Sequence, residues 1–379
     1  MNLKLKRSII ILSVNMIIVG LGVVISELIF GNWIHSNNLT KLNMVRSQTI
    51  KYNIEDLYGS SSPEINYTRD EYGLRGSFKD PSEIDILTVG GSTTDQRNIM
   101  DGETWQDVIQ EQFKQIGEEF VVANAGIDGQ STFGHIKNFD WWFPEIPNLK
   151  PKYILFYVGI NDFYKDEGAG NDALISTNGT WSVRQTLSEK SAIFNLLRTL
   201  KGIYKAQLEQ SVGLAHRSVD HSKVGWINNA MLSSYGDLMK TRLNEYAERL
   251  NILIDKTRDV GSIPIFVTQP SRTYRKKDGV IEGSRWTIRY DNTKINGLDF
   301  YYMIRKLDKV TISVCQARRV VCIDMAEDTV WEDNDFYDRW HMTPKGTKKL
   351  GLYLFERLNK IVDADEQGVV AKVGSLLND

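Results

Sequence analysis

The stretch Ile86-Leu-Thr-Val-Gly-Gly-Ser-Thr-Thr94 decides how the rest of this chain is interpreted. Four apolar or β-branched residues run into two glycines, and Ser92 follows, with Thr93, Thr94 and Asp95 as caps for a helix. Such a run predicts a strand, a tight turn and a helix N-terminus. The turn places the Ser92 hydroxyl at the carboxyl end of a strand, where open parallel sheets bind ligands. Taken alone, the stretch is better explained by a serine that only caps the helix.

Further strands and helices alternate along the chain and indicate an α/β fold. Apolar runs at residues 119–123 and 152–158 each end in a polar stretch that contains glycine, and later strands are predicted at 263–268 and 320–325. Strands of a parallel sheet end in this way when one edge of the sheet carries a site. We therefore predict a three-layer α/β/α sandwich with a central parallel five-stranded sheet. Its helices are expected at residues 103–115, 133–142, 235–260, 299–317 and 347–362.

Length and composition indicate a globular protein with one large domain. The chain has 379 residues, of which 41% are hydrophobic and 25% are charged, as is ordinary for folded proteins. A formal net charge of -2 and the lack of a basic stripe exclude a nucleic-acid binder. The sequence has two cysteines, Cys315 and Cys322, which excludes a disulfide scaffold and a cysteine-rich zinc site. Whether these two form a local disulfide stays open, because the Cα separation that a disulfide needs is not visible in a sequence.

A long apolar segment near the N-terminus predicts a membrane anchor. Residues 9–30 are mostly apolar, and Lys4, Lys6 and Arg7 precede them. About twenty such residues span a bilayer as a helix, and cations at its start place the N-terminus in the cytoplasm. The bulk of the chain then lies in the periplasm or outside the cell. A cleaved signal peptide is the competing interpretation; we favour an uncleaved anchor because the run is long for a signal peptide and no Ala-x-Ala site follows it.

Two further regions carry residue types that complement a serine nucleophile. Ester hydrolysis needs a nucleophile, a base, a group that orients the base, and donors for the oxyanion. Asp338 and His341 lie in a polar loop after the last predicted strand, so the carboxylate can hold one ring nitrogen while the other faces a substrate. Gly129 can offer a backbone N–H and Asn161 a side-chain amide. Each also has an ordinary explanation, since glycine permits a turn with positive φ and asparagine caps helices.

Four blocks of sequence carry these residues in the order Ser, Gly, Asn, His: Val89-Gly-Gly-Ser-Thr93, Asn124-Ala-Gly-Ile-Asp-Gly129, Val158-Gly-Ile-Asn-Asp162 and Asp338-Arg-Trp-His341. Together they resemble the SGNH, or GDSL-type, hydrolase family over roughly residues 84–362. The resemblance implies a flavodoxin-like SGNH fold. It also implies Ser92 as nucleophile, His341 as base and Asp338 as the acid that orients it. The implied oxyanion hole consists of the Ser92 and Gly129 N–H groups and the Asn161 amide.

One position departs from the family pattern. Gly91 stands where the older name of the family has Asp. That Asp is outside the catalytic set, so the chemistry is unaffected, but the departure separates the chain from the typical lipases of the family. The α/β-hydrolase fold fits worse, because its Gly-x-Ser-x-Gly elbow requires a glycine at Thr94 and its triad acid does not usually lie three residues before the histidine.

The resemblance and the anchor together predict a serine esterase that acts on acyl esters, O-acetyl esters above all, of a cell-envelope glycan. Membrane-tethered members of this kind are often linked to O-acetylation or deacetylation of cell-surface polysaccharides. A polysaccharide O-acyltransferase with a membrane partner that donates acyl groups, and a non-catalytic envelope binding or assembly factor, are the alternatives. We expect no cofactor and no metal. Aromatic residues of the insertions can stack on sugar rings or pack in the core: Trp181, Trp226 and Trp286.

The expected division of the chain follows from these assignments. An anchor and a polar spacer with a lead-in strand precede the hydrolase domain. Near the end of the spacer, two glycines at residues 72–76 indicate a turn from which Arg75 could reach the domain surface, and we favour an ordinary structural turn. The parts are residues 1–30 as anchor, 31–83 as spacer and lead-in, 84–362 as hydrolase domain with insertions at about 165–233 and 274–298, and 363–379 as tail.

Overall fold

The computed structural model describes residues 3–31, 44–58, 64–165 and 218–367, together with isolated positions between 33 and 42 and between 187 and 197. The chain forms two compact units, which are described separately. One consists of residues 43–174 and 215–379, and the other of residues 1–42 and 175–214. Most of the insertion predicted at 165–233, Trp181 included, lies outside the described residues.

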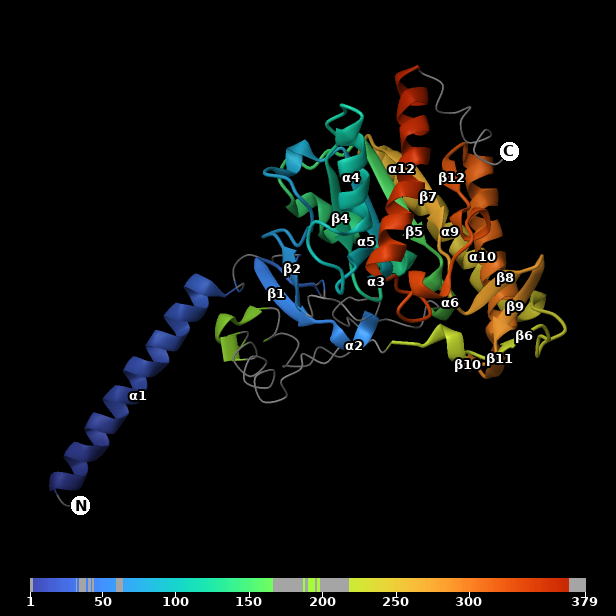
Figure 1. The fold of residues 1–379 in the computed structure, drawn as a ribbon. Coiled ribbons are helices and arrows are strands. Elements are labelled where there is room, and N and C mark those ends of the chain that lie inside the picture. Colours follow the sequence, from blue (N-terminus) through green and yellow to red (C-terminus); the bar gives the residue numbers. More distant parts are fainter. Residues whose placement is uncertain are drawn as a thin grey trace. The chain divides into compact units, whose positions relative to one another are not determined.

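The larger unit is built around the predicted parallel sheet, which is confirmed (Figure 1). All five strands run parallel and are almost entirely buried, as expected for a sheet that is covered on both faces. In spatial order they are β12 (Val321–Ile323), β7 (Ile263–Thr268), β5 (Tyr153–Val158), β3 (Ile86–Gly90) and β4 (Val122–Gly126).

The strand order creates a switch point beside β3. The chain passes from β3 to β4 on one side and then to β5 on the other. Segments that leave the carboxyl ends of β3 and β5 therefore diverge, and a crevice for ligands forms at such points in open α/β sheets. Ser92 follows β3 and Asn161 follows β5, so the fold brings both to this crevice.

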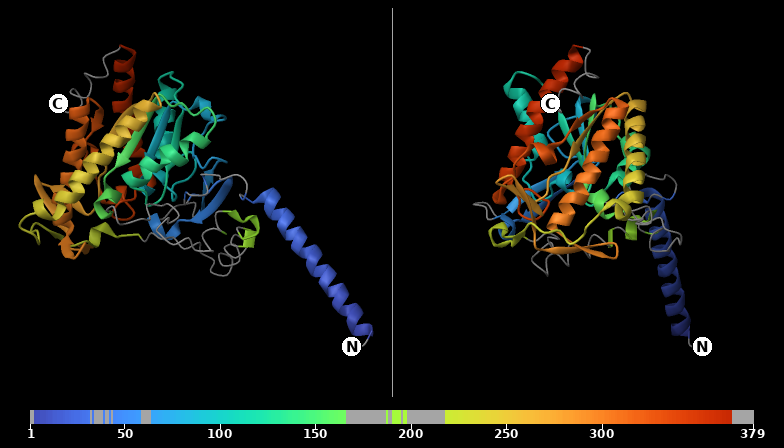
Figure 2. Two further views of the ribbon diagram at one scale, coloured as in Figure 1. Left: turned by 180° about the vertical axis from the view of Figure 1, so that it is seen from behind. Right: turned by 90° about the vertical axis from the view of Figure 1, so that its right-hand side faces the viewer.

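Helices cover both faces of the sheet and complete three layers (Figure 2). One face packs against α4 (Trp105–Gln115) and α12 (Pro344–Glu366), whose apolar residues form a continuous core with the strands. On the other face, α9 (Gly236–Asp259) lies beside α5 (Thr132–Trp141) and α10 (Gly297–Arg318). The predicted sandwich therefore has the layers that the alternating sequence pattern indicated.

Side-chain caps fix where the helices of the first layer begin. Thr104 accepts a hydrogen bond from Asp107 N at 3.2 Å and caps α4. Thr343 accepts one from Gly346 N at 3.3 Å, and Pro344 occupies the first position of α12. Each cap contributes about 1 kcal/mol. Because α12 begins just after His341, its cap also fixes the end of the loop that carries this histidine.

Two predicted segments differ from the structure. The second strand was predicted at residues 119–123, but β4 occupies 122–126, because Val122 pairs with Ile86 of β3 while Phe120 packs on Phe113. The charged segment at 274–298 contains strands that the sequence analysis did not predict. They form antiparallel pairs, with β6 (Trp226–Ile227) beside β9: β8 (Tyr274–Lys277), β9 (Val280–Ser284), β10 (Thr287–Tyr290) and β11 (Thr293–Asn296).

Short helices follow the ends of several strands, and a disulfide joins two elements. Cys315 of α10 and Cys322 of β12 form a disulfide with a Cα separation of 6.0 Å, which answers the question that the sequence left open. The short helices are α3 (Ser92–Asp95), α6 (Ile160–Tyr164) and α11 (Met325–Asp328), with single 3-10 turns at 81–83, 143–145, 221–223 and 333–335.

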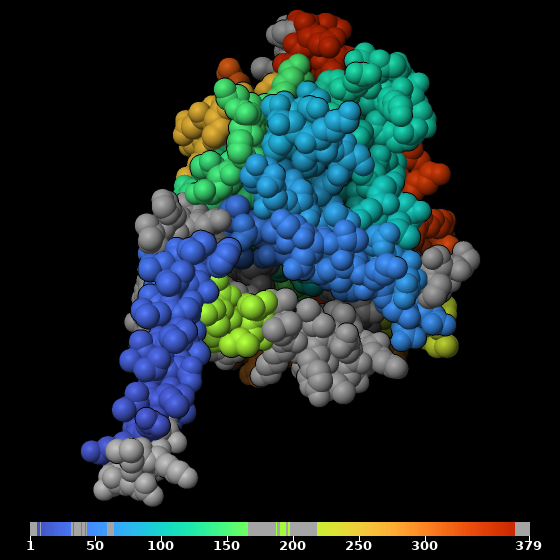
Figure 3. Space-filling view, turned by 90° about the vertical axis from the view of Figure 1, so that its left-hand side faces the viewer, coloured from blue at the N-terminus to red at the C-terminus, as the bar shows by residue number. Residues whose placement is uncertain are grey.

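The predicted spacer contains a packed hairpin rather than a simple lead-in strand. Strands β1 (Gln48–Asn53) and β2 (Glu64–Arg69) pair antiparallel, with α2 (Glu55–Tyr58) between them. Every second residue of β2 is buried. The space-filling view shows this blue segment lying directly against the cyan and teal surface of the sheet domain (Figure 3). Arg75, in the turn that follows, is 3% exposed.

The smaller unit contains the N-terminal helix α1 (Leu3–Phe30). Residues 9–30 have a mean hydropathy of 2.6, and none of this window is buried. By length and composition the helix is a candidate membrane span or a signal sequence. Near its end, Glu27 accepts hydrogen bonds from Ser191 Oγ at 2.5 Å and from the N–H groups of Ala192 and Ile193 at 3.1 Å.

Candidate active site

Ser92 is the first residue of α3, and the two glycines before it are required by close contacts. Gly91 is the N-cap, so the Ser92 hydroxyl does not cap the helix as the ordinary explanation had it. A Cβ on Gly90 would lie 2.0 Å from Thr94 Oγ1, and a Cβ on Gly91 would lie 2.1 Å from Asn161 Nδ2. The departure at Gly91 therefore has a steric reason, since the Asn161 amide occupies the space that a side chain would need.

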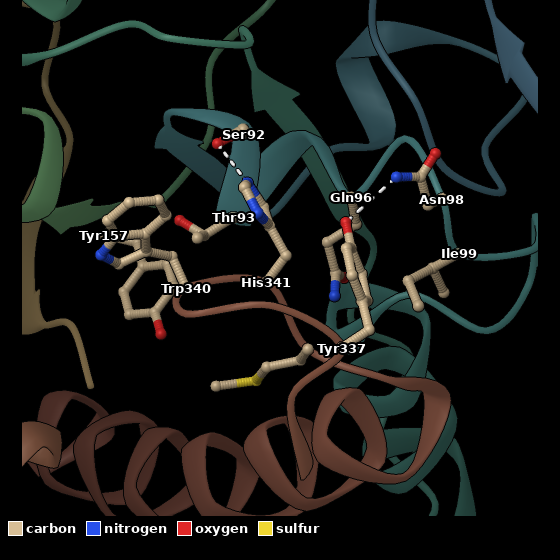
Figure 4. A pocket seen from close by; sticks show the side chains of 10 residues that line it. Ser92, Thr93, Gln96, Asn98, Ile99, Tyr157, Tyr337, Trp340 and His341 are labelled. Carbon is tan, nitrogen blue, oxygen red and sulfur yellow. Dashed lines mark hydrogen bonds between the residues drawn. The ribbon is translucent and has the colours of Figure 1, made fainter. Parts of the chain in front are cut away.

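The structure brings Ser92, His341 and Asp338 into one chain of hydrogen bonds. Figure 4 shows the bond between Ser92 and His341. His341 Nε2 lies 2.7 Å from Ser92 Oγ, and His341 Nδ1 lies 2.7 Å from Asp338 Oδ2. Because a carboxylate only accepts, Nδ1 carries the hydrogen and Nε2 accepts the hydrogen of the serine hydroxyl. The other oxygen, Asp338 Oδ1, accepts from the N–H groups of Trp340 at 2.8 Å and His341 at 2.7 Å. Both carboxylate oxygens of Asp338 are thus held in place.

Residues that the sequence analysis missed support the loop around His341. The Tyr337 ring stacks on the His341 ring, with centroids 5.7 Å apart and planes 13° apart. His221 is buried and donates from Nε2 to Asp338 O at 3.0 Å. Burial lowers the pKa of His221, so its ring is neutral at pH 7. No sequence signal identified His221, because it lies far from the loop along the chain.

Two of the three predicted oxyanion donors, Gly129 and Asn161, lie on neighbouring turns. Gly129 has a φ of 74° in the turn between β4 and α5, a conformation that favours glycine. Its carbonyl accepts a hydrogen bond from Lys165 Nζ. Asn161 Nδ2 donates to Gln130 O at 2.8 Å. Since an amide nitrogen carries two hydrogens, this bond orients Asn161 against the Gly129 turn and still leaves one hydrogen for another acceptor.

Gln269 connects the serine side of the site to the asparagine side. It is 4% exposed and follows the end of β7. Its Nε2 donates to Thr93 Oγ1 at 2.7 Å, and its Oε1 accepts from Ile160 N at 2.9 Å. The start of α3 and the start of α6 are therefore held by one buried amide. The sequence signal for Gln269 is its position as a polar residue directly after a buried strand.

The space next to the serine is small and bordered by aromatic rings. A pocket of about 10 Å³ lies beside Ser92 and His341, and Gln96, Tyr157 and Tyr337 are among the residues that line it (Figure 4). Pockets for drug-sized ligands usually measure about 300–1,000 Å³. As the described residues form it, this pocket is therefore suited to a small acyl group rather than to a long acyl chain.

An aromatic cluster continues from this pocket. Trp340 lines the pocket, and its ring contacts Tyr164 and Trp286 with centroids 6.1 Å and 6.3 Å apart. The Arg339 guanidinium stacks over Trp286, 3.4 Å from the ring centroid. Tyr164 is 40% exposed. Of the tryptophans considered for sugar stacking, Trp286 thus lies in the cluster next to the serine, whereas Trp226 packs under Arg272 and Arg275.

A metal centre is not evident in the described part of the chain. There, no group of three or more His, Cys, Asp or Glu side chains is arranged to hold a metal ion. The chemistry available at this sheet edge is that of a hydroxyl, an imidazole, a carboxylate and several N–H donors.

Comparison with protein families decides the assignment. The model of the family described as GDSL-like Lipase/Acylhydrolase matches residues 86–354, which is more than half of the chain. The chain belongs to the GDSL-like lipase/acylhydrolase family. It is accordingly a serine hydrolase or esterase, and the match spans all four sequence blocks.

Solved structures of esterases are similar to this chain at low sequence identity. The psychrotrophic esterase EstA from a Pseudoalteromonas species is 10% identical, with a TM-score of 0.40, and the match covers 73% of this chain and 98% of that one. A catalytic mutant of Axe2, an acetylxylan esterase from Geobacillus stearothermophilus, is 14% identical, with a TM-score of 0.40 and coverage of 72% and 92%. The comparison with curated proteins gives no match.

Proposed function

We propose that this serine esterase removes short acyl groups, O-acetyl in particular, from a cell-envelope glycan through an acyl-enzyme on Ser92. The observation that carries the proposal is the chain of 2.7 Å hydrogen bonds from Ser92 through His341 to Asp338. A serine hydroxyl becomes a nucleophile when a base lies within hydrogen-bond reach and a third group orients that base. Residues 84–362 form the hydrolase domain in this proposal.

In the first step, Ser92 Oγ attacks the carbonyl carbon of the ester while His341 Nε2 takes the hydroxyl proton. Asp338 keeps the imidazole in the required tautomer and stabilises the imidazolium that forms. The tetrahedral oxyanion is bound by the Ser92 and Gly129 N–H groups and by the Asn161 amide. Each such donor contributes about 3 kcal/mol to the transition state.

The intermediate then expels the leaving alcohol, which takes the proton from His341. In the second step His341 removes a proton from water, and the resulting hydroxide equivalent attacks the acyl-enzyme. Acetate leaves and the proton returns to Ser92. If a sugar hydroxyl replaces water, the same site performs O-acyl transfer, and a membrane partner would then supply the acyl groups.

The surroundings of Ser92 support a short acyl group on a sugar. The pocket beside the serine is small, and the cluster of Tyr164, Trp286 and Trp340 offers ring faces at its border. Aromatic side chains combine an apolar face with a polar edge, which suits ligands that are apolar on one side and hydroxylated on the other. The candidate membrane helix α1 supports an envelope location for the substrate.

The test compares the purified protein with its Ser92→Ala variant on p-nitrophenyl acetate. We expect the variant to lose at least a factor of about 10³ in kcat, because the covalent step is removed. Equal rates for the two proteins would exclude Ser92 as the nucleophile. In the parent, p-nitrophenyl acetate should be cleaved far faster than p-nitrophenyl palmitate, since the pocket is small.

The acceptor is identified with an acetylated oligosaccharide and, separately, with an acyl donor and an unmodified oligosaccharide. Release of free acetate from the first, without acylated sugar in the second, supports the esterase. Mass-spectrometric detection of newly acylated sugar in the second supports the transferase.

A further inference from the structure

One buried arginine from the hairpin joins the two sides of the candidate active site. Arg69, the last residue of β2, is 2% exposed. Its Nη2 pairs with Asp95 Oδ1 at 2.6 Å and also donates to Gly126 O. Its Nε donates to Tyr67 Oη at 2.5 Å, and the Tyr67 hydroxyl in turn donates to Asp95 Oδ1 at 2.7 Å. Asp95 belongs to α3, which begins with Ser92, and Gly126 ends β4, which leads to Gly129.

The two segments that Arg69 joins lie in backbone contact. A Cβ on Gly126 would lie 2.2 Å from Asp95 N and 2.7 Å from Thr94 C. The main chain of α3 and the main chain at the end of β4 are therefore in direct contact. Any shift between them alters the distance from the Ser92 hydroxyl to the Gly129 N–H, which is the distance that the reaction depends on.

The ion pair that fixes this contact is fully charged. Burial alone would raise the pKa of Asp95, but the positive charges of Arg69 and Arg97 outweigh it and hold the pKa below its ordinary value. Separating the two partners of a buried ion pair would leave each charge buried without compensation, which is strongly unfavourable. The pair therefore stays in contact and keeps its geometry. The guanidinium fork can bond a carboxylate and a carbonyl at once.

A second arginine of the same segment holds the other end of α3. Arg75 donates from Nη1 to Asp95 O at 2.9 Å and to Gln96 O at 2.8 Å, and from Nη2 to Ile99 O at 2.6 Å. These carbonyls lie at and after the C-terminus of α3. The hairpin segment therefore holds this short helix at its side and at its end.

We infer that Arg69 is a positioning residue for the reaction at Ser92, because it sets α3 against the turn that carries Gly129. The inference rests on the proposed function of Ser92 and Gly129. It assigns a part in catalysis to a segment that precedes the family match, which begins at residue 86. Arg69 acts through α3 and β4 and does not touch the substrate.

The experiment measures kcat per active site in the full-length chain carrying Arg69→Lys. A lysine can pair with Asp95 but lacks the fork that also reaches Gly126. We expect kcat on p-nitrophenyl acetate to fall about 10- to 100-fold while KM changes less than about twofold. Active sites are counted by labelling with a fluorescent fluorophosphonate, so that kcat is expressed per reactive serine. A role in folding alone would lower the number of labelled sites and leave kcat per site unchanged.

Two further variants make the result decisive. Gly126→Ala inserts a methyl group between β4 and α3 while leaving the Arg69 side chain unchanged, and it should give the same fall in kcat per site. Arg305→Lys is the matched control, because Arg305 is a largely buried arginine that pairs with Asp308 and Asp324 at 2.8 Å and 2.7 Å, and these partners belong to neither α3 nor β4. It should keep the parent kcat per site.

Parental kcat per site in Arg69→Lys would overturn the inference. If Arg69→Lys does not fold, Gly126→Ala decides, and its parental kcat per site would also overturn the inference. The Ser92→Ala variant separates this failure from failure of the proposed function. An inactive Ser92→Ala together with a fully active Arg69→Lys would remove only the inference, whereas a fully active Ser92→Ala would remove both.

Discussion

Gly91 and Asn161 occupy adjoining space beside the serine. This proximity explains why residue 91 is glycine, although the family pattern alone suggests that the replacement of aspartate by glycine has no effect. A Cβ at position 91 would lie 2.1 Å from Asn161 Nδ2 and 2.9 Å from Gln130 O. The chain therefore combines a glycine before the serine with an asparagine amide placed close to the main chain. Restoring the aspartate of the family name should damage this site rather than leave it unchanged.

We predict that Gly91→Asp lowers kcat on p-nitrophenyl acetate by about 10²-fold or more, because the new side chain displaces the Asn161 amide from the oxyanion. The measurement is steady-state kinetics together with a thermal melt. Gly236→Asp is the matched control, since nothing lies within 4 Å of a Cβ at Gly236, which begins α9. If Gly91→Asp kept the parent kcat, the position of the Asn161 amide would not depend on the absence of a side chain at residue 91.

At the residue scale, the sequence indicated the candidate residues that the structure places next to one another, but not the residues that hold them in place. Ser92, Asn161 and His341 could be predicted because their types, placed after strands, have few uses other than capping or chemistry. Gln269 and His221 could not, because a buried amide or imidazole acquires its role only from partners far along the chain. Their hydrogen bonds exist only once the strands are side by side.

At the element scale, the strands of the sheet were predictable because burial on both faces leaves continuous apolar runs. The hairpin was not recognised, although Glu64–Arg69 alternates exposed and buried residues with the period of two that a half-buried strand shows. The inward residues include Tyr67 and Arg69, whose polar ends hide this pattern. An arginine is interpreted as a surface residue until its buried partner is known, and that partner, Asp95, lies on another element.

Helix α10 carries a buried carboxyl group that should make stability depend on pH. Burial raises the pKa of Asp308 to about 7, although Arg305 pairs with it at 2.8 Å. In the unfolded chain the pKa of aspartate is about 3.9. Between about pH 4 and 7 the folded protein keeps a proton that the unfolded chain has lost. The free energy of unfolding therefore falls as pH rises through this range, by up to about 4 kcal/mol from this group.

We predict that Asp308→Asn removes this loss, because an amide cannot ionise. The free energy of unfolding of the variant, relative to the parent, should increase from pH 4.5 to pH 7.5. Urea unfolding at these two values and at pH 6 measures the difference. Asp255→Asn serves as control. Asp255 is exposed and pairs with Arg318, and the pKa of Asp255 lies below its ordinary value. The difference in free energy of unfolding between this variant and the parent should therefore stay constant over this pH range. A flat difference for Asp308→Asn would contradict the raised pKa.

For the whole molecule, the chain's pattern predicted a parallel α/β domain after an apolar N-terminal helix, but it could not predict which residues make up each of the two compact units. The hydrogen bonds described around Ser92, His341 and Asn161 all come from residues 43–174 and 215–379. Helix α1 belongs to the other unit, where Glu27 bonds to Ser191. Catalysis and membrane attachment should therefore be separable.

We predict that the full chain stays with membranes after carbonate extraction, whereas a chain without residues 1–30 is soluble and keeps kcat on p-nitrophenyl acetate within about twofold. The 22-residue apolar window is about 33 Å long as a helix, enough to cross the hydrocarbon core. As a matched control, Val19→Lys with Leu21→Lys should release the intact chain, because charges at the centre of a span cost several kcal/mol. Sequencing of the mature N-terminus separates the two interpretations of the helix. A start beyond Phe30 would show a cleaved signal peptide, and a large fall in kcat on truncation would show that the site depends on α1.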